Sequence, residues 1–386
     1  MHSNTILHQL MTLIPRHQFE NAVSEYSGDR YVKTFTTWKQ LTTLLYAQAS
    51  GKNSLRDIQT SLETQGSKLY HLGLTAVKRS TLSDANRDRD YQIMEKLFYH
   101  LLARCQQIAP KHQFRFKNPA YAFDSSTIDL CLSLFPWAKF RQTKGAVKLH
   151  CQLDLRGQIP SFSTITDGKC ADIRAARLFL DLIPDSIYIL DRGYIDFNWF
   201  NLIDESKAFF VTRAKDAMAY QITGQQEIDL KKGLLFDQTI QLTGPLSQQK
   251  YDKPLRLVGF YDAETKNTYH FLTNNFKLAA FTIAQLYKAR WHVELFFKWI
   301  KQHLKIKTFL GTSKNAVMTQ IWAAMSYFLL LAYIKFQTRF KQSLFFLHRL
   351  VQNTLLDRLG LVDLLHLTEK KLPQVRNMDP QLCFRF

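Results

Sequence analysis

The alternation of short apolar segments with helical patterns between residues 118 and 214 constrains the fold more than any other feature of this sequence. Runs of four to eight apolar or alternating residues predict strands, whereas apolar residues at helical spacing predict helices. In chain order the predicted elements are strand 120–130, a hairpin of strands 146–155 and 158–167, helix 171–183, strand 186–190, helix 196–206 and strand 208–214.

The order β-β-β-α-β-α-β predicts an α/β fold with a ribonuclease-H-like sheet. In such a sheet the first strand (120–130) and the fourth strand (186–190) are central neighbours. The fourth strand, SIYIL, is almost wholly apolar, as expected of a strand between parallel neighbours. From about 216 to 276 the chain becomes strand-rich and polar again, which predicts a β-rich insertion inside a catalytic domain of residues 116–340.

Two flanking regions are predicted to be helical. Residues 1–115 show helical periodicity with basic residues in the turns, a pattern suited to contacts with the DNA backbone. Packing or dimerisation is the alternative role for such a segment. Helices continue after the catalytic domain into a C-terminal helical tail, 341–386.

The charge of the chain indicates a polyanionic partner. With 51 basic and 32 acidic residues, the net charge is +19, and DNA or RNA is the commonest partner of such a surface. A basic protein with no such partner is the alternative. The five cysteines form no CxxC pair and the N-terminus lacks a signal-peptide pattern, which predicts a cytoplasmic protein. The apolar run 321–334 is short for a membrane span, so a buried core helix is expected there and no membrane association.

One glutamate stands alone in a basic segment. Between residues 265 and 356 there are 13 lysines or arginines and a single acid, Glu294. A solvated helix face usually mixes both signs of charge, with acids spaced to pair with bases. An isolated acid therefore suggests a specific task for a carboxylate, such as holding a cation.

A helical projection groups Glu294 with several basic residues. If residues 287–305 form one helix, six polar side chains fall within a stripe about 80° wide, between two apolar flanks. This arrangement predicts a helix packed into a core with one edge facing a cleft. An amphipathic helix with solvated cations is the alternative. The six residues of the stripe are Tyr287, Arg290, Glu294, Lys298, Lys301 and Lys305.

Two aspartates complete a predicted metal site. Asp124 and Asp191 each end a predicted strand, and these strands are central neighbours in the proposed sheet. Together with Glu294 they would form a set of hard oxygen ligands for Mg²⁺, for which Mn²⁺ is expected to substitute. Two such ions about 4 Å apart can activate a nucleophile and stabilise a leaving oxygen in phosphodiester displacement. Asp167, at another strand end, is the competing candidate.

These residues resemble the motifs of a known family. Tyr287, Arg290, Glu294 and Lys301 match the Y-x2-R-x3-E-x6-K signature of IS4-family DDE transposases. FDSST around Asp124 and LDRGY around Asp191 are similar to the two aspartate motifs of that family. The β insertion before the glutamate helix is also a family feature, and the resemblance covers roughly residues 116–335.

The resemblance implies an enzyme that cuts DNA at the inverted-repeat ends of an insertion sequence and joins the freed 3′-hydroxyls to target DNA. Asp124, Asp191 and Glu294 would be the catalytic metal ligands, and Tyr287, Arg290 and Lys301 would bind the DNA near the cut. Lys298 and Lys305 belong to the same basic seam. Trp291 could stack on an extruded base, with a plain core tryptophan as the alternative.

Two other functions remain open at this point. One is a different nuclease on the same sheet, which would cut without needing inverted-repeat ends. The other is a catalytically silent DNA-binding derivative, which the three acids and the intact basic seam argue against. Pairing of two DNA ends further implies at least a homodimer in the working complex, acting at the bacterial nucleoid.

Overall fold

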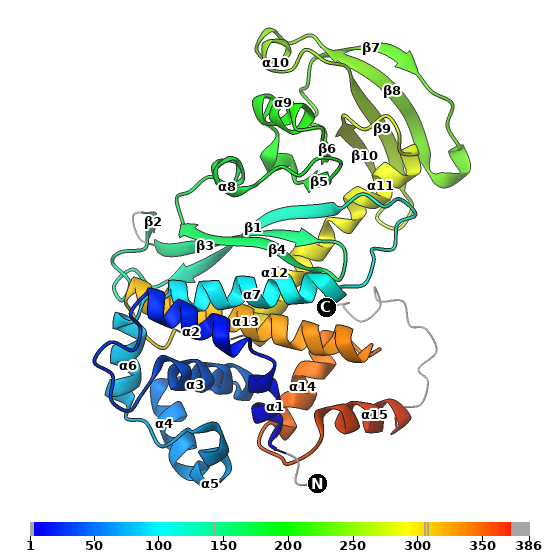
Figure 1. Cartoon of the computed structure of the whole chain (residues 1–386). Coiled ribbons are helices and arrows are strands. Elements are labelled where there is room, and N and C mark those ends of the chain that lie inside the picture. Colours follow the sequence, from blue (N-terminus) through cyan, green and yellow to red (C-terminus); the bar gives the residue numbers. More distant parts are fainter. Residues whose placement is uncertain (1–3, 142–143, 305, 307–308, 372–386) are drawn as a thin grey trace. The chain divides into compact units, whose positions relative to one another are not determined.

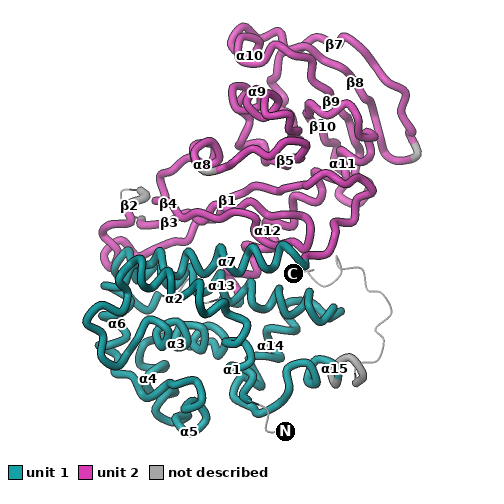
Figure 2. Tube along the Cα trace, viewed as in Figure 1, with its two compact units in different colours: residues 1–108, 303–386 teal, residues 109–302 magenta. Residues whose placement is uncertain are grey.

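The computed structural model describes residues 4–141, 144–304, 306 and 309–371. Its contacts separate the chain into two compact units, which Figure 2 shows in different colours. The helical unit contains residues 1–108 together with 303–386. The α/β unit contains residues 109–302. The residues predicted to hold the site, up to Lys301, therefore lie within a single unit.

The helical unit combines helices from both ends of the chain (Figure 1). Several of its helices begin at a capping hydroxyl; the Ser54 side chain, for example, accepts a hydrogen bond from the backbone N–H of Asp57. The helices are α1 (Ile6–Thr12), α2 (Arg16–Glu25), α3 (Thr37–Ser50), α4 (Leu55–Thr64), α5 (Gly66–Leu69), α6 (Arg79–Asp88), α7 (Gln92–Ile108), α13 (Lys314–Thr338), α14 (Leu344–Thr354) and α15 (Leu361–Lys371).

Helix α13 is the centre of this unit. It packs along α7 and also contacts α3, α6 and α14. It is apolar on nearly all sides, because the run 321–334 leaves no polar stripe, and such a helix must be covered all round. By length and composition α13 could cross a membrane, but 94% of its most apolar window is buried inside the structure. The core position predicted for 321–334 is thus the one observed.

The position of α13 bears on the predicted catalytic domain of residues 116–340, which stays a prediction. Within the structure, α13 groups with the N-terminal helices and not with the sheet. The physical reason is that its apolar surface is covered by α7 and α3. The predicted tail 341–386 likewise belongs to the helical unit up to Lys371, and its last residues lie outside the described part of the chain.

The stretch 79–107, within the region of helical periodicity, is divided in the structure between two helices, α6 and α7. The chain turns between the two helices, and the side chain of Asn315 on α13 forms hydrogen bonds with backbone groups at this turn. Its amide nitrogen donates to the carbonyls of Asn86 and Arg89, and its amide oxygen accepts from the N–H of Tyr91. Long-range bonds of this kind leave no local sequence signal.

The α/β unit is built on one sheet whose strands follow the order β2-β3-β1-β5-β6-β10-β9-β8-β7, with β4 paired to β3. Strand β5 pairs in parallel with β1 on one side and β6 on the other, as the sequence predicts for its apolar run. The strands are β1 (Ala120–Leu130), β2 (Lys139–Arg141), β3 (Lys144–Asp154), β4 (Ile159–Asp167), β5 (Ile187–Leu190), β6 (Phe209–Arg213), β7 (Tyr220–Gln225), β8 (Leu234–Leu242), β9 (Leu255–Asp262) and β10 (Asn267–Thr273).

The predicted β insertion extends this sheet. Strand β10 pairs antiparallel with β6, and β9, β8 and β7 follow in order toward the edge. The short helix α10 (Pro245–Lys250) lies between β8 and β9 in the chain. Strand β7 was not predicted, because its residues are mostly exposed and show little apolar alternation. The insertion thus widens the sheet beyond the strands that carry the aspartates.

One face of the sheet forms a hydrophobic core with two helices. Tyr121 and Phe123 in β1, and Tyr188 and Leu190 in β5, pack into one core with residues of α8 (Asp172–Phe179) and α9 (Phe197–Glu205). Successive side chains in a strand point to opposite faces. The positions immediately after Phe123 and Leu190 therefore project from the other face, away from α8 and α9.

Candidate active site

Asp124 and Asp191 follow the last parallel pair of the central strands. Strands β1 and β5 pair through Phe123 and Leu190, and each aspartate is the next residue along its chain. Both therefore project from the same face at the same level of the sheet. The sequence suggested that Asp124 ends its strand. In the structure Asp124 lies inside β1, because β1 continues in antiparallel pairing with β3. The end of the parallel pairing, and not the end of the strand, sets the position of the site.

A guanidinium joins these aspartates to Glu294. Helix α11 (Ala280–Ala289) contacts strands β5, β6, β8, β9 and β10, and it is followed by Arg290 and α12 (Trp291–His303). Arg290 Nη2 lies 2.5 Å from Oε1 of Glu294 and 4.0 Å from Oδ1 of Asp191. Arg290 Nη1 lies 3.7 Å from Oδ2 of Asp124. Three carboxylates from three separate elements thus meet around one cation.

The predicted continuous helix from 287 to 305 is divided at Arg290. The N–H of Val293 donates to the carbonyl of Arg290, three residues back, so the backbone tightens between α11 and α12. The change of helix at Arg290 does not separate it from Glu294, which lies one turn later. Lys298 is exposed on α12 and Lys301 is half-buried near its end, whereas Lys305 lies outside the described residues.

Burial and neighbouring charges shape the electrostatics of the site. Burial raises the pKa of Asp124 to about 6, while the N–H of Ser125 and the Arg290 guanidinium act in the opposite direction. Glu294 and Asp191 repel its charge and raise the same pKa further. Arg290 is itself largely buried, with 13% of its side chain exposed. Its positive charge is therefore what allows three acidic groups to approach one another in this structure.

The chemistry of these side chains fits a divalent cation. Carboxylate oxygens are the ligands that Mg²⁺ and similar hard ions prefer. In the described part of the chain, no group of three or more potential ligands is already close enough to hold an ion. The guanidinium of Arg290 supplies the positive charge that the carboxylates share. A bound divalent ion would compete with that guanidinium for the same oxygens.

A family model for the transposase DDE domain matches residues 115–329, which is more than half of the chain. The chain belongs to the DDE transposase family. It is a DNA transposase, an enzyme of the polynucleotidyl transferase and endonuclease class, and such enzymes act on DNA and generally use divalent metal ions. A second model, described as a domain of unknown function (DUF4372), matches residues 2–75.

Two bacterial relatives agree with this assignment. The chain is 36% identical over 256 residues to a Sinorhizobium fredii protein named "Putative transposase y4zB", covering 65% of this chain and 69% of the relative. It is 30% identical over 277 residues to the "Probable transposase for insertion sequence element IS5377" of Geobacillus stearothermophilus, covering 69% and 70%. A piggyBac transposase in a synaptic complex with hairpin DNA is similar with a TM-score of 0.47 and 12% identity, covering 96% of this chain and 83% of that one.

Tyr287 and Trp291 flank the arginine of the transposase site. The ring of Tyr287 packs against Phe271 at 4.9 Å between centroids, and Arg290 lies 5.6 Å from the centre of the same ring. Burial raises the pKa of Tyr287, so its hydroxyl stays protonated at neutral pH. Trp291 is 57% exposed, which rules out the alternative that it is a core side chain. An exposed indole next to Arg290 in the chain is available for stacking.

The competing candidate Asp167 does not join the site. Asp124 is level with Cys151 of β3, which in turn is level with Ser163 of β4. Asp167 lies four residues farther along β4, at the end of the strand. Its carboxylate accepts hydrogen bonds from the backbone N–H groups of Lys169 and Cys170 and so fixes a turn. The three acids proposed from the sequence are therefore the ones that converge.

A polar cluster on the opposite face of the sheet was missed by the sequence reasoning. Asp172, at the start of α8, accepts hydrogen bonds from Ser125 Oγ at 2.6 Å and from Lys148 Nζ at 3.0 Å. His150 is fully buried beside Asp172, and burial lowers its pKa to about 4, so it is neutral at pH 7. Ser125 follows Asp124 directly, so this cluster anchors the backbone beside Asp124. The only sequence signal was Asp172, which resembles an ordinary helix cap.

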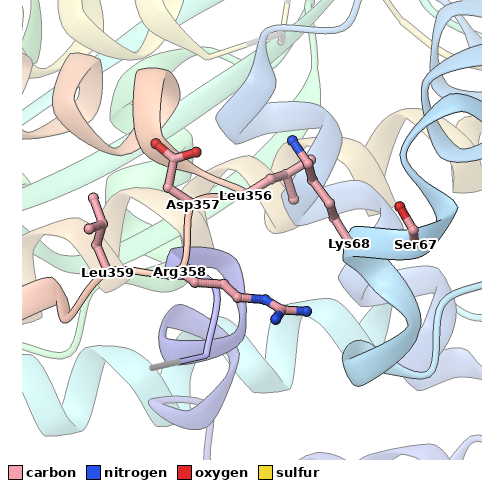
Figure 3. A pocket seen from close by; sticks show the side chains of 6 residues that line it. All are labelled: Ser67, Lys68, Leu356, Asp357, Arg358 and Leu359. Carbon is pink, nitrogen blue, oxygen red and sulfur yellow. The ribbon is translucent and has the colours of Figure 1, made fainter. Parts of the chain in front are cut away.

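A hollow of about 580 Å³ lies in the helical unit, and none of the predicted site residues lines it (Figure 3). Its lining comes from α5 and from the connection between α14 and α15. Nη2 of Arg358, one of the lining residues, lies 3.1 Å from the ring nitrogen Nε2 of His71. The lining residues are Ser67, Lys68, Leu356, Asp357, Arg358 and Leu359.

Proposed function

We propose that this transposase cuts DNA at the inverted-repeat ends of an insertion sequence and transfers the freed 3′-ends into target DNA, as a member of the IS4 group with a ribonuclease-H-like catalytic domain. The observation that carries the proposal is the meeting of Asp124, Asp191 and Glu294 around Arg290, at the point where the parallel pairing of β1 with β5 ends. Acids at this position are the residues that a polynucleotidyl transferase requires.

The three carboxylates are proposed to hold Mg²⁺, with Mn²⁺ as a substitute. When bound, the metal would lower the barrier to attack on a phosphodiester and stabilise the leaving oxygen. The protein's own contribution is to place hard oxygen donors from a strand, a strand end and a helix within reach of one another. Asp124 is the most buried of the three, and this burial raises its pKa above the usual range of an aspartate.

The basic and aromatic residues around the acids are proposed to hold the DNA. Arg290 would hold phosphate oxygens with its planar guanidinium once the carboxylates are engaged with metal. Its Nε is buried and has no hydrogen-bond partner among the described residues, so it can donate to an incoming group. Trp291 would stack on a base drawn out of the duplex. Lys298, Lys301 and Lys305 would follow the phosphates, and Tyr287 would orient a terminal one.

Residues 1–115 are proposed to bind DNA, and the working complex is proposed to be at least a homodimer, because two element ends must be brought together. The protein would act in the bacterial cytoplasm at the nucleoid. A nuclease that cuts without element ends, or a catalytically silent DNA-binding derivative, would share the same fold. Cleavage assays separate these three possibilities.

The experiment that tests the proposal uses a labelled duplex carrying the inverted repeat that flanks the coding DNA. We expect Mg²⁺-dependent cleavage at the repeat boundary and, with an added target duplex, a joined product on a sequencing gel. A scrambled duplex of equal length is the control and should remain intact. Equal cutting of both duplexes would indicate a general nuclease, and binding without cutting in Mg²⁺ or Mn²⁺ would indicate a silent derivative.

Arg290 offers a separate prediction. Because its guanidinium competes with metal for the carboxylates, Arg290→Ala should bind Mn²⁺ more tightly than the wild type, while cleavage slows by about 100-fold or more. Arg290→Lys should recover cleavage only in part, since an ammonium cannot make a two-pronged phosphate contact. Isothermal calorimetry with Mn²⁺ and single-turnover cleavage at saturating DNA measure the two effects. Wild-type cleavage by Arg290→Ala would rule out its phosphate role.

A further inference from the structure

The connection between α2 and α3 in the helical unit is basic and carries aromatic residues. Between α2 and α3, from residue 26 to residue 36, the sequence contains two cations, Arg30 and Lys33, and one acid, Asp29. The Asp29 carboxylate is turned inward, where it accepts hydrogen bonds from the N–H of Thr37 at 2.6 Å and from its hydroxyl at 2.7 Å. The charge that this connection presents to solvent is therefore positive.

Tyr31 projects from this connection. Its exposure of 88% is the greatest among the large hydrophobic residues of the described chain. It also has a φ of 59°, in the left-handed region that aromatic residues rarely adopt. Such a conformation costs free energy and persists only where the surrounding structure holds it. An exposed ring on a backbone conformation that costs free energy suggests that the ring contacts another molecule.

The connection is held firmly on both sides of Tyr31. The N–H of Gly28 donates to the carbonyl of Val23, and the N–H of Val32 donates to the carbonyl of Asp29. On the far side, the Arg89 guanidinium bonds to the carbonyl of Phe35 and donates to the Gln40 side chain at 3.1 Å. These bonds connect the loop to α3 and to the turn between α6 and α7. The position of Tyr31 is therefore set by the fold.

Arg30 accompanies the ring. Its guanidinium carbon lies 5.0 Å from the centre of the Tyr31 ring, and its Nη2 donates to the Tyr31 hydroxyl at 3.2 Å. Lys33, also exposed, follows two residues later. A planar cation beside an exposed ring, with a second cation nearby, combines phosphate binding with a surface for bases or sugars.

We infer that the 27–36 connection is a DNA-contacting element of the transposase, in which Arg30 and Lys33 bind backbone phosphates and the Tyr31 ring packs against a base or deoxyribose. The element lies inside residues 2–75, which match a domain of unknown function. The inference rests on the proposed function, because the DNA it binds is the element end. Charge decides the kind of partner, since two exposed cations beside an inward-turned acid favour a polyanion over a neutral protein surface.

Fluorescence anisotropy with the labelled end duplex, in EDTA so that no cleavage occurs, tests this inference. Tyr31→Ala and Tyr31→Gly should each weaken binding about tenfold, and Tyr31→Phe should retain most of the affinity. The double variant Arg30→Ala/Lys33→Ala should reduce the slope of log affinity against log salt by about 1.8, or roughly 0.9 per lost phosphate contact. Tyr70→Ala is the matched control, because Tyr70 is an exposed (61%) tyrosine of the same unit.

Tyr31→Gly also separates a binding role from a structural one. Glycine adopts positive φ without steric cost, so the melting temperature of this variant should be equal to or above that of the wild type while its DNA affinity falls. If Tyr31→Ala and Tyr31→Gly both bound the duplex as tightly as the wild type, the inference would be wrong while the proposed function would stand. A loss of self-association with unchanged DNA affinity would assign the loop to contacts between copies, which also overturns it. A wild-type protein that bound no duplex would contradict both proposals.

Discussion

Single alanine replacements of Asp124, Asp191 or Glu294 are expected to lower DNA cleavage by at least about three orders of magnitude. Metal-assisted catalysis contributes several kcal/mol to the transition state, and each 1.36 kcal/mol corresponds to a tenfold change in rate. Each carboxylate comes from a different element and all three meet at Arg290, so no neighbour can replace a missing one. Single-turnover cleavage of the end duplex in Mg²⁺ measures the loss.

Binding of the uncut end should survive in the same variants. Removing an acid near the DNA takes away repulsion with phosphates, so anisotropy in EDTA should show equal or tighter binding. Asp167→Ala is the matched control, because Asp167 is an acid at the end of β4 that serves a turn and lies away from Asp124. Cleavage by this control should remain near the wild-type rate. Near-normal cleavage by any of the three site variants would remove that residue from the ligand set.

Arg256→Ala is expected to destabilise the α/β unit by about 3–5 kcal/mol, because it leaves a buried carboxylate without its counter-charge. Arg256 in β9 donates to both oxygens of Asp237 in β8, at 2.8 and 2.7 Å, and the two side chains are 3% and 4% exposed. Its other nitrogen donates to the carbonyls of Asn275 and Leu278, just before α11 begins. Urea unfolding followed by circular dichroism measures the free energy of unfolding.

Two further variants test whether loss of the buried charge pair causes this destabilisation. Glu264→Ala removes one partner of the exposed Lys288–Glu264 pair in the same unit and should cost less than about 1 kcal/mol. The double variant Asp237→Leu/Arg256→Met removes both buried charges and should recover most of the loss. Because the carbonyls of Asn275 and Leu278 lose their donor, the free energy of unfolding should remain about 1–3 kcal/mol below that of the wild type. Equal stability of Arg256→Ala and Glu264→Ala would show that the buried pair does not hold the sheet together.

The same arginine links stability to the site. Arg256 holds the chain at Asn275 and Leu278, and Asn275 Oδ1 accepts from the N–H groups of Lys277 and Leu278. Helix α11 starts directly after this corner and leads to Arg290. The β insertion therefore does more than widen the sheet, because its strands β8 and β9 fix the start of the helix that carries the guanidinium to the carboxylates.

The sequence by itself determined the α/β class, the adjacency of β1 and β5, and the acids that converge. These follow from local causes: an apolar run such as SIYIL is typical of a strand between parallel neighbours, and Glu294 is the single acid of a long basic segment. The helical spacing also predicted that Arg290 and Glu294 share one face. All of these signals are contained in short stretches of chain.

Only the tertiary structure decided where Arg290 points, how α13 is placed and which residues support Asp124. The guanidinium turns toward three acids because their summed charge outweighs the cost of burying it, a balance that involves residues up to 170 positions apart. Helix α13 groups with the N-terminal helices because its apolar surface is covered by α7 and α3. Asp172 and Asn315 act through bonds to distant segments. Interactions of this kind depend on which surfaces meet after folding, and no local pattern records them.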